Sequence, residues 1–278
     1  MRPDDVRDDA HMIPDDIARV IRTGFASGTV VVLTGAGISA ESGIPVFRGK
    51  GGLWETYDPA IYANPEGLRR LIACSAGKLV DFMVDFYGVL CKASPNPAHT
   101  ALVALERQHR LSAVITQNID NLHQQAGSRT VIELHGNAYR IRCISCAREL
   151  TYERDRLREM VVLLKKSRES KQRIYRVLSR YFPRCDCGGR FRIDVVFFGE
   201  PLAPRILESA HKFLSACSVL LIIGSSLNVY PAASLPGYAR QNGATLVEIN
   251  DEPSALAALC DYRLPGKASQ ILLELAQL

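Results

Sequence analysis

Small residues and polar residues occur in this sequence where predicted strands end. Gly35, Gly37 and Ala40 follow the β-branched run at residues 29–32. They match the pattern in which small residues permit a tight turn and let backbone amides approach a pyrophosphate at the start of a helix. Taken alone the match is weak, because glycine-rich turns after strands are common. A dinucleotide site therefore needs support from other strand ends.

The loop that follows departs from the dehydrogenase pattern. Gly43 and Pro45 interrupt the long helix that normally follows these glycines, because glycine and proline are the poorest helix formers. More loop follows, and it carries Trp54, the only tryptophan in the chain. We therefore expect this loop to cover the nicotinamide end of a dinucleotide, and not to lead into a second strand.

Two further predicted strands end in polar residues. The run at residues 111–116 is followed by Gln117, Asn118 and Asp120, and the run at residues 131–134 is followed by His135. Ligands of open parallel sheets bind outside the carboxyl ends of the strands, so these residues should share one crevice with the glycine loop. A histidine with a pKa near ~6.5 suits general-base catalysis. A lone histidine at a strand end more often only satisfies hydrogen bonds, so this role needs the surrounding motifs.

The composition restricts the class of protein. The chain has 278 residues, of which 47% are hydrophobic and 23% charged, which is ordinary for one or two globular domains. No apolar run approaches the ~20 residues that span a bilayer. The N-terminus lacks the basic-then-apolar order of a signal peptide. We expect a cytoplasmic protein without membrane contact, in which residues 1–13 form a disordered leader.

Four of the eight cysteines form two close pairs. Cys143 and Cys146 are separated by two residues, and Cys185 and Cys187 by one residue, followed by two glycines. Four thiolates in this arrangement suit one tetrahedral structural Zn²⁺ with no open position for catalysis, although the second spacing is shorter than usual. The other cysteines stand alone in apolar contexts typical of a core: Cys74, Cys91, Cys217 and Cys260.

The segment between the cysteine pairs, residues 147–184, is strongly basic. It holds twelve Lys or Arg and five Asp or Glu, a net charge of +7 in a chain of +5, so the remainder carries −2. A solvated helix face is the favoured explanation, and contact with nucleic acid or an acidic partner is the alternative. Apolar residues at helical spacing predict two amphipathic helices: Leu157, Met160, Val161 and Leu164, then Ile174, Val177, Leu178 and Tyr181.

Seven blocks, spread over nearly the whole chain, resemble one known family. They are Gly-Ala-Gly-Ile-Ser (35–39), Ser-Gly-Ile-Pro-Val-Phe-Arg (42–48), Thr-Gln-Asn-Ile-Asp-Asn-Leu-His (116–123), Glu-Leu-His-Gly (133–136), Asp-Val-Val-Phe-Phe-Gly-Glu (194–200), Gly-Ser-Ser (224–226) and Glu-Ile-Asn (248–250). The sequence resembles a sirtuin of the bacterial type, a family of NAD-dependent protein-lysine deacylases. As a set the blocks are far more specific than any one of them.

The resemblance implies an α/β fold, a Rossmann-like parallel sheet with a smaller helical plus zinc-binding domain. We assign residues 14–46, 97–136 and 195–278 to the NAD-binding domain. The helical part of the smaller domain is residues 47–96, and residues 137–194 form the zinc module with its basic helical insertion. NAD and the acylated lysine of a protein or peptide would bind in the cleft between the two domains.

The resemblance also implies roles for individual residues. His135 is the general base that activates a ribose hydroxyl, and Asn118 and Gln117 position ribose hydroxyls and a water. Asp120 and the backbone around Ile38 hold the nicotinamide amide, while Phe47 shields the ribose after nicotinamide leaves. The other predicted NAD contacts are Gly35, Ala36, Gly37, Ser39, Arg48, Trp54, Ile119, Gly224, Ser225, Ser226, Asn250, Asp251, Glu252 and Ala268.

The predicted substrate site has two peptide walls and an acyl pocket. Residues 196–200 should pair with an extended peptide through main-chain bonds, opposite residues 227–230. The predicted substrate contacts are Tyr87, Leu90, Val196, Phe198, Gly199, Glu200, Leu227 and Val229. Family members that prefer succinyl or malonyl lysine carry a Tyr and, three residues later, an Arg on the same helix face. Leu90 stands at the position of that Arg, so we expect deacetylation, with longer aliphatic chains as a second possibility.

Other functions fit parts of the sequence. An NAD-dependent ADP-ribosyltransferase or NAD hydrolase would use the same NAD site, although the intact Asn118 and His135 speak against it. A nucleic-acid-binding zinc protein that keeps an NAD fold would use the basic segment. The sequence does not indicate the oligomeric state. Structural roles are expected for the remaining histidines outside the N-terminal leader: His99, His109, His123 and His211.

Overall fold

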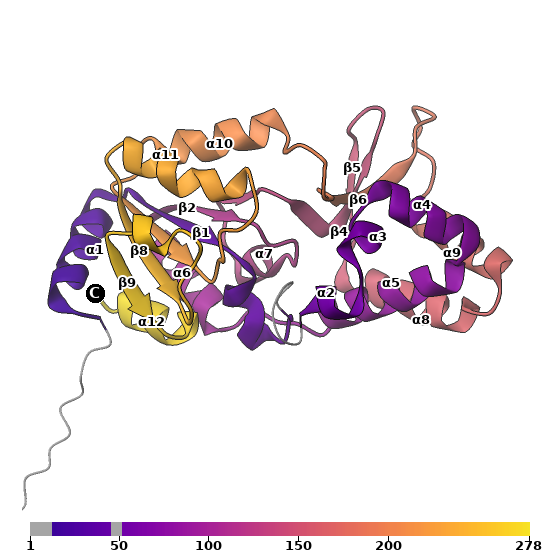
Figure 1. Ribbon diagram of the computed structural model, residues 1–278, viewed down its shortest axis with the longest axis horizontal. Helices are drawn as coiled ribbons and strands as arrows, with labels where there is room; N and C mark the ends of the chain where they lie inside the picture. Colours follow the sequence, from indigo (N-terminus) through magenta and orange to yellow (C-terminus); the bar gives the residue numbers. More distant parts are fainter. Residues whose placement is uncertain (1–12, 46–51) are drawn as a thin grey trace, which may run out of the picture.

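A six-stranded parallel sheet is the centre of the computed structural model, which describes residues 13–45 and 52–278. The strand order is β3-β2-β1-β7-β8-β9 (Figure 1). Chain order reverses at β1, which gives the doubly wound order of dinucleotide-binding folds. This confirms the predicted fold class. The strands are β1 (Val30–Thr34), β2 (Leu111–Thr116), β3 (Val131–Glu133), β7 (Val219–Ile223), β8 (Thr245–Asn250) and β9 (Tyr262–Pro265).

Both faces of this sheet are covered by helices. Val30 and Val32 of β1 belong to one buried cluster, and Val31 and Leu33 belong to another on the opposite face, because side chains alternate along a strand. The first cluster contains α1 (Asp15–Ser27), α6 (Pro97–Arg107) and α12 (Ala268–Leu275), and the second contains α10 (Pro204–Leu214) and α11 (Leu235–Gln241). Burial on both faces explains the unbroken apolar run of β1.

A second body lies beside the sheet (Figure 1). It contains a three-stranded antiparallel sheet in the order β5-β4-β6 and two groups of helices. The strands are β4 (Gly136–Cys143), β5 (Glu149–Thr151) and β6 (Phe191–Val195). The helices are α2 (Leu53–Thr56), α3 (Pro59–Tyr62), α4 (Pro65–Cys74), α5 (Ala76–Leu90), α8 (Arg154–Ser167) and α9 (Lys171–Tyr181). The last two correspond to the helices predicted in the basic segment.

The basic segment packs firmly on α5. Leu157 and Met160 of α8 are buried in one cluster with Met83 of α5, and each such side chain contributes about 1.5–3 kcal/mol when fully buried. Arg168 binds both carboxylate oxygens of Asp81, with N–O distances of 2.6 and 2.8 Å. The α8–α9 pair is therefore part of the helical body and not a loosely attached insertion.

Direct backbone hydrogen bonds join the loop that follows β1 to the end of β7 and the loop after it. The Gly37 N–H donates to the Gly224 carbonyl at 2.8 Å, and the Gly35 N–H donates to the Ile223 carbonyl at 3.0 Å. A Cβ at Gly37 would lie 2.7 Å from the Gly224 Cα, and Gly224 itself has a φ of +59°. The glycines are therefore required for contact between the two loops at the point where strand order reverses.

The chain starts to pack one residue earlier than predicted. Ile13, assigned to the disordered leader, is buried in the core, and its N–H donates to Glu274 at 3.2 Å. The other leader residues, 1–12, lie outside the described part of the chain.

Within the described ranges, no helix combines the length and the apolar composition needed to cross a membrane. The remaining short helices are η1 (Ala36–Ser42), α7 (Leu122–Ala126), η2 (Ala232–Ser234) and η3 (Ala257–Leu259).

Candidate active site

Three strand ends of the large sheet meet through side-chain hydrogen bonds. Gln117, after β2, donates its amide to the Ser225 hydroxyl, after β7, at 2.8 Å. Asn118 donates to the Gly35 carbonyl, after β1, at 3.0 Å. The Ser39 hydroxyl donates to Asp120 at 2.7 Å. The structure therefore brings these predicted residues to one edge of the sheet, as the rule for parallel sheets requires.

Asn118 is held in one orientation. Its side-chain amide donates to the Gly35 carbonyl and, at 3.2 Å, to the Ser39 hydroxyl. Its backbone N–H donates to the Thr116 hydroxyl at 3.0 Å, and the residue is buried. Because both amide protons are engaged, its side-chain carbonyl oxygen is the atom left to accept a hydrogen bond from a ligand or a water.

Asp120 has a partner on each carboxylate oxygen. One oxygen accepts from the Leu122 N–H at 2.9 Å, at the start of α7, and the other accepts from Ser39. Burial raises the pKa of this carboxyl group, and the two hydrogen bonds oppose that rise. Asp120 thus fixes the turn into α7 and still lines a cavity beside Asn118.

The hydrogen bond at His135 assigns its tautomer. Its Nδ1 lies 3.0 Å from the Gln117 carbonyl oxygen. A carbonyl can only accept, so Nδ1 carries the proton and Nε2 presents a lone pair. Burial lowers the pKa of His135, and the bond to Gln117 partly opposes this. The neutral imidazole is therefore favoured at pH 7, with Nε2 able to accept a proton.

An ion-pair network supports the chain on either side of His135. Arg140 binds Glu133 at 2.8 Å and Asp194 at 2.6 Å, and Arg142 binds Asp194 at 3.1 Å. The His135 carbonyl also accepts from the Val196 N–H at 2.9 Å. This network joins β3, β4 and β6 next to His135. Sequence reasoning missed it, because only the folded sheet brings these charges together.

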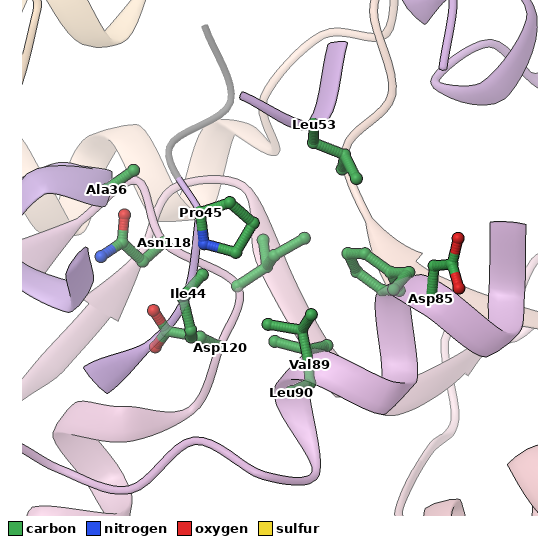
Figure 2. Close-up of a pocket in the computed structure, with 11 residues that line it drawn as sticks. Ala36, Ile44, Pro45, Leu53, Asp85, Val89, Leu90, Asn118 and Asp120 are labelled. Atoms are coloured by element: carbon green, nitrogen blue, oxygen red, sulfur yellow. The ribbon is translucent and has the colours of Figure 1, made fainter. Parts of the chain in front are cut away.

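A cavity of about 80 Å³ opens between the glycine loop and α5 (Figure 2). Figure 2 shows Asn118 and Asp120 on one side, with Val89 and Leu90 of α5 facing them. Among the described residues that line the cavity, the two charged side chains are acidic: Asp85 and Asp120. The described lining residues are Ala36, Ile44, Pro45, Leu53, Asp85, Phe86, Val89, Leu90, Asn118, Ile119 and Asp120.

One predicted pocket residue lies elsewhere. Tyr87 is absent from the cavity lining, and its side chain is buried in the same cluster as Met160 of α8. Successive helical residues are rotated by about 100°, so Phe86, with Val89 and Leu90, shares the cavity face while Tyr87 turns toward α8. Of the two predicted acyl-pocket residues on α5, Leu90 thus lines this cavity and Tyr87 does not, and Phe86 lies beside Leu90 on the cavity face.

The predicted peptide segment is fixed by its own contacts. The Phe198 N–H donates to the Ala63 carbonyl at 2.9 Å. Glu200 accepts from Arg192, at 2.6 Å for one pair of atoms, and from the Phe197 N–H at 3.0 Å. Its carboxylate therefore holds the turn of the segment for which main-chain pairing with a peptide is predicted.

The other predicted residues of the two peptide walls differ in how exposed they are. The Phe198 ring is 40% exposed, with the Trp54 ring 6.1 Å away between centroids. Gly199 has a φ of +85° in the turn before Glu200. On the other wall, Leu227 is buried and Val229 is half-buried. The large exposed hydrophobic side chains of the two walls are Phe198 and Tyr230.

The predicted adenosine-side residues follow β7, β8 and β9. Asn250 donates to the Ser225 carbonyl at 3.1 Å, and the Ser226 carbonyl accepts from the Ala255 N–H at 3.0 Å. Ala268 begins α12. Asp251 and Glu252 are exposed at the same end of the sheet. Phe47 and Arg48 lie outside the described residues.

Asn96 is a positioning residue that sequence reasoning missed. Its side-chain oxygen caps α6 by accepting from the Ala98 N–H at 2.9 Å. Its amide donates to the Ile38 carbonyl at 2.7 Å and to the Ser42 hydroxyl at 3.1 Å. An Asn before Pro97 is a recognisable cap signal, but the second contact, which holds η1 in place, appears only in the fold.

The other histidines occupy structural positions. His99 and His123 are buried with ring centroids 4.9 Å apart, and burial lowers their pKa values to about 4 and about 3. The His123 Nε2 atom lies 3.1 Å from the hydroxyl oxygen of Thr34, at the end of β1. His211 lies against the Tyr238 ring at 4.2 Å, and His109 is exposed with a φ of 56°.

The two cysteine pairs form one cluster. The four sulfur atoms lie within 4.8 Å of one another, and two of the S–S distances, Cys143–Cys187 and Cys146–Cys185, are 3.6 Å. Tetrahedral zinc with Zn–S bonds of about 2.3 Å separates its sulfur ligands by about 3.8 Å, so the cluster fits structural zinc. A Cβ at Gly189 would lie 2.7 Å from the Cys143 sulfur. The glycine thus accommodates the short second spacing.

Comparisons with known proteins agree with this geometry. The Sir2 family model matches residues 35–231. An NAD-dependent protein deacylase of Pyrococcus abyssi is 42% identical over 258 residues, which cover 92% of this chain and 95% of that protein. An NAD-dependent protein deacylase of Desulfosudis oleivorans is 42% identical over 244 residues, covering 87% of each chain.

Solved structures show the same similarity. The structure of a Sir2 homologue–NAD complex is similar, with a TM-score of 0.74 and 38% identity, and the match covers 93% of this chain and 92% of the other. A structure described as Sir2 bound to acetylated peptide has a TM-score of 0.69 and 31% identity, with coverage of 89% and 92%.

Replacing one thiolate of the cluster should release the metal. Cys185→Ser leaves three sulfur ligands, and because metal binding is coupled to folding here, zinc content and thermal stability should fall together. Metal analysis of the wild-type protein should give about one zinc per chain. Cys74→Ser, at an exposed lone cysteine, is the control and should keep its zinc. Zinc-free wild-type protein, or full zinc in Cys185→Ser, would contradict the assignment.

Proposed function

Because the chain belongs to the Sir2 family, we infer that it removes acyl groups from protein lysines with NAD as cosubstrate. The observation that carries the inference is the position of His135. Its Nε2 lone pair lies on an imidazole fixed by Gln117, and the neighbouring Asn118 is fixed by the β1 loop. A base and an oriented amide are thus combined at the edge where NAD folds bind their ligand.

The reaction that we propose is acyl transfer to ADP-ribose. The acyl oxygen of the substrate attacks the ribose carbon that bears nicotinamide, and the bond to nicotinamide breaks. His135 then takes the proton from a ribose hydroxyl at Nε2, and the activated oxygen attacks the acyl carbon. The C–N bond to lysine breaks, lysine leaves with the proton, and one water adds to the remaining intermediate to give the ester and a free ribose hydroxyl. The products are free lysine, nicotinamide and O-acyl-ADP-ribose. No step requires a hydride acceptor.

The remaining contacts are proposed from the positions of the side chains. The free carbonyl oxygen of Asn118 would accept from a ribose hydroxyl or a water. Asp120, with Ser39 held against it, would hold the nicotinamide amide together with the backbone of Ile38. Ser225 and Asn250, joined to each other, would hold the adenosine side. Phe47 keeps its predicted role of shielding the ribose, and Arg48 keeps its predicted role as an NAD contact.

The substrate that we propose is an acylated lysine in an extended peptide. Residues 196–200 begin at the Val196 N–H, which is bonded to the His135 carbonyl, so a peptide paired along this segment would pass next to the base. The bound acetylated peptide named for a similar Sir2 structure supports this. The eight free cysteines suit a reducing compartment, and we propose a cytoplasmic location.

The cavity favours an uncharged acyl group. Leu90 stands on its wall at the position where the succinyl-selective pattern has an Arg. Among the lining residues that the structure describes there is no cation, and Asp85 and Asp120 are acidic. A carboxylate on the acyl group would lose hydration without gaining a partner, which is unfavourable. We therefore propose acetyl, or a longer aliphatic chain, as the preferred group.

Removing the imidazole should stop acyl transfer without unfolding the protein. His135→Ala should lower kcat/KM for an acetyl-lysine peptide by about 10²–10⁴, the usual contribution of a general base. Wild-type kcat/KM should fall as acid protonates His135, with a midpoint below pH ~6.5 because burial lowers its pKa. The control His211→Ala, on α10, should keep this profile. Near-normal turnover in folded His135→Ala would contradict the role.

Acyl selectivity should respond to residue 90. The wild-type protein should prefer an acetyl peptide to the matching succinyl peptide by roughly a hundredfold, since an unpaired buried carboxylate costs about 3 kcal/mol. Leu90→Arg should raise the succinyl-to-acetyl ratio of kcat/KM, because a guanidinium binds a carboxylate in two places. Leu90→Met, similar in size and uncharged, is the control. A wild-type preference for succinyl would contradict the proposal.

A further inference from the structure

The outer side of α8 and α9 carries cations that the fold does not neutralise. Helix α9 contains no Asp or Glu. Several arginines of the basic segment have acidic partners, as Arg168 has Asp81 and Arg180 has Glu159. In the described ranges, no ion pair involves four exposed cations of these two helices, which we call the α8–α9 surface: Lys165, Lys166, Arg173 and Arg176.

These cations stand on a fixed scaffold. Ile174 of α9 is buried between the exposed Arg173 and Arg176, so the helix shows its charged side outward. Lys171 donates to the Ala73 carbonyl at 2.6 Å, and the Tyr175 hydroxyl donates to the Ile72 carbonyl at 3.2 Å. Both bonds tie α9 to α4. The surface thus presents its charges from packed helices, and no ordering of a loop is required for binding.

The position of the surface leaves the active site open. Helices α8 and α9 lie at one end of the molecule, and α1 and α12 lie at the other (Figure 1). The cavity lies between the sheet and α5 and contains no residue of α8 or α9. A partner on the α8–α9 surface would therefore not block the site at which we propose that NAD and peptide bind.

The chemistry of the surface favours phosphate over carboxylate partners. Nine of the twelve cations in residues 147–184 are arginines, whose planar guanidinium group binds phosphate oxygens in two places. Tyr175 is 41% exposed, and the Lys171 ammonium lies 5.9 Å from its ring centroid. The exposed part of such a ring is a surface on which bases stack. Rows of fixed cations with an exposed aromatic suit a repeating anionic backbone.

We propose that the α8–α9 surface binds the phosphodiester backbone of nucleic acid without reading its sequence. The partner is identified by its repeating phosphates, which duplex DNA and single-stranded RNA share. Binding there would hold the enzyme beside proteins on the same nucleic acid while the cleft stays free. This inference does not depend on the deacylase reaction, and it can fail or succeed separately from it.

The test measures binding of the full chain to labelled duplex DNA and single-stranded RNA of about 20 nucleotides or base pairs. Fluorescence anisotropy at several salt concentrations gives Kd and its salt slope. The variant Lys166→Gln, Arg173→Gln, Arg176→Gln should weaken binding at least tenfold and reduce the slope by roughly 2 to 3, about 0.9 for each lost phosphate contact. Comparing the two probes shows whether one form of backbone is preferred.

The matched control removes the same charge elsewhere. Arg19→Gln, Arg22→Gln, Lys212→Gln changes exposed cations on α1 and α10 that form no ion pair within the described chain, and it should leave Kd within about twofold. Both variants should retain acetyl-peptide turnover, which shows that they fold. Equal weakening by the control, no salt-dependent binding by the wild type, or competition by polyglutamate as strong as by DNA would overturn the proposal.

Discussion

The site depends on direct backbone contact between two loops, made at glycines that have no side chain. Gly35 and Gly37, after β1, bond directly to Ile223 and Gly224, after β7, and a Cβ at Gly37 would lie 2.7 Å from the Gly224 Cα. This contact sets the path of η1, and with it the position of Ser39 against Asn118 and Asp120. In a dinucleotide fold these glycines are usually explained by approach to phosphate. Here they serve loop-to-loop contact as well.

Helix α5 connects the site to the basic helices. One side of α5 lines the cavity with Phe86, Val89 and Leu90, and the adjoining side packs Met83 and Tyr87 into one buried cluster with α8. The α8–α9 pair therefore supports the back of the cavity wall, while its outer side keeps unpaired cations. A segment that looks like a charged insertion in the sequence thus has a buried structural side and an exposed side available to a partner.

Features that depend on local residue patterns could be predicted from the sequence. Strand ends, helices and cysteine spacing all depend on neighbouring residues, so the sheet, the two basic helices and the sulfur cluster could be foreseen. Contacts between distant segments could not. The second bond of Asn96 and the pairing of Arg140 with Asp194 join residues far apart in sequence. Tyr87 was assigned by resemblance alone, and only the folded helix shows that it lies outside the cavity lining.

The central claim is that the acyl group leaves lysine and joins ADP-ribose. It is tested most directly by incubating the protein with NAD and an acetyl-lysine peptide and measuring all products by mass. The account predicts deacetylated peptide, nicotinamide and O-acetyl-ADP-ribose in equal amounts, with NAD consumption dependent on the acylated peptide. Free ADP-ribose formed without peptide, or ADP-ribose attached to a protein, would contradict it and indicate an NAD hydrolase or an ADP-ribosyltransferase instead.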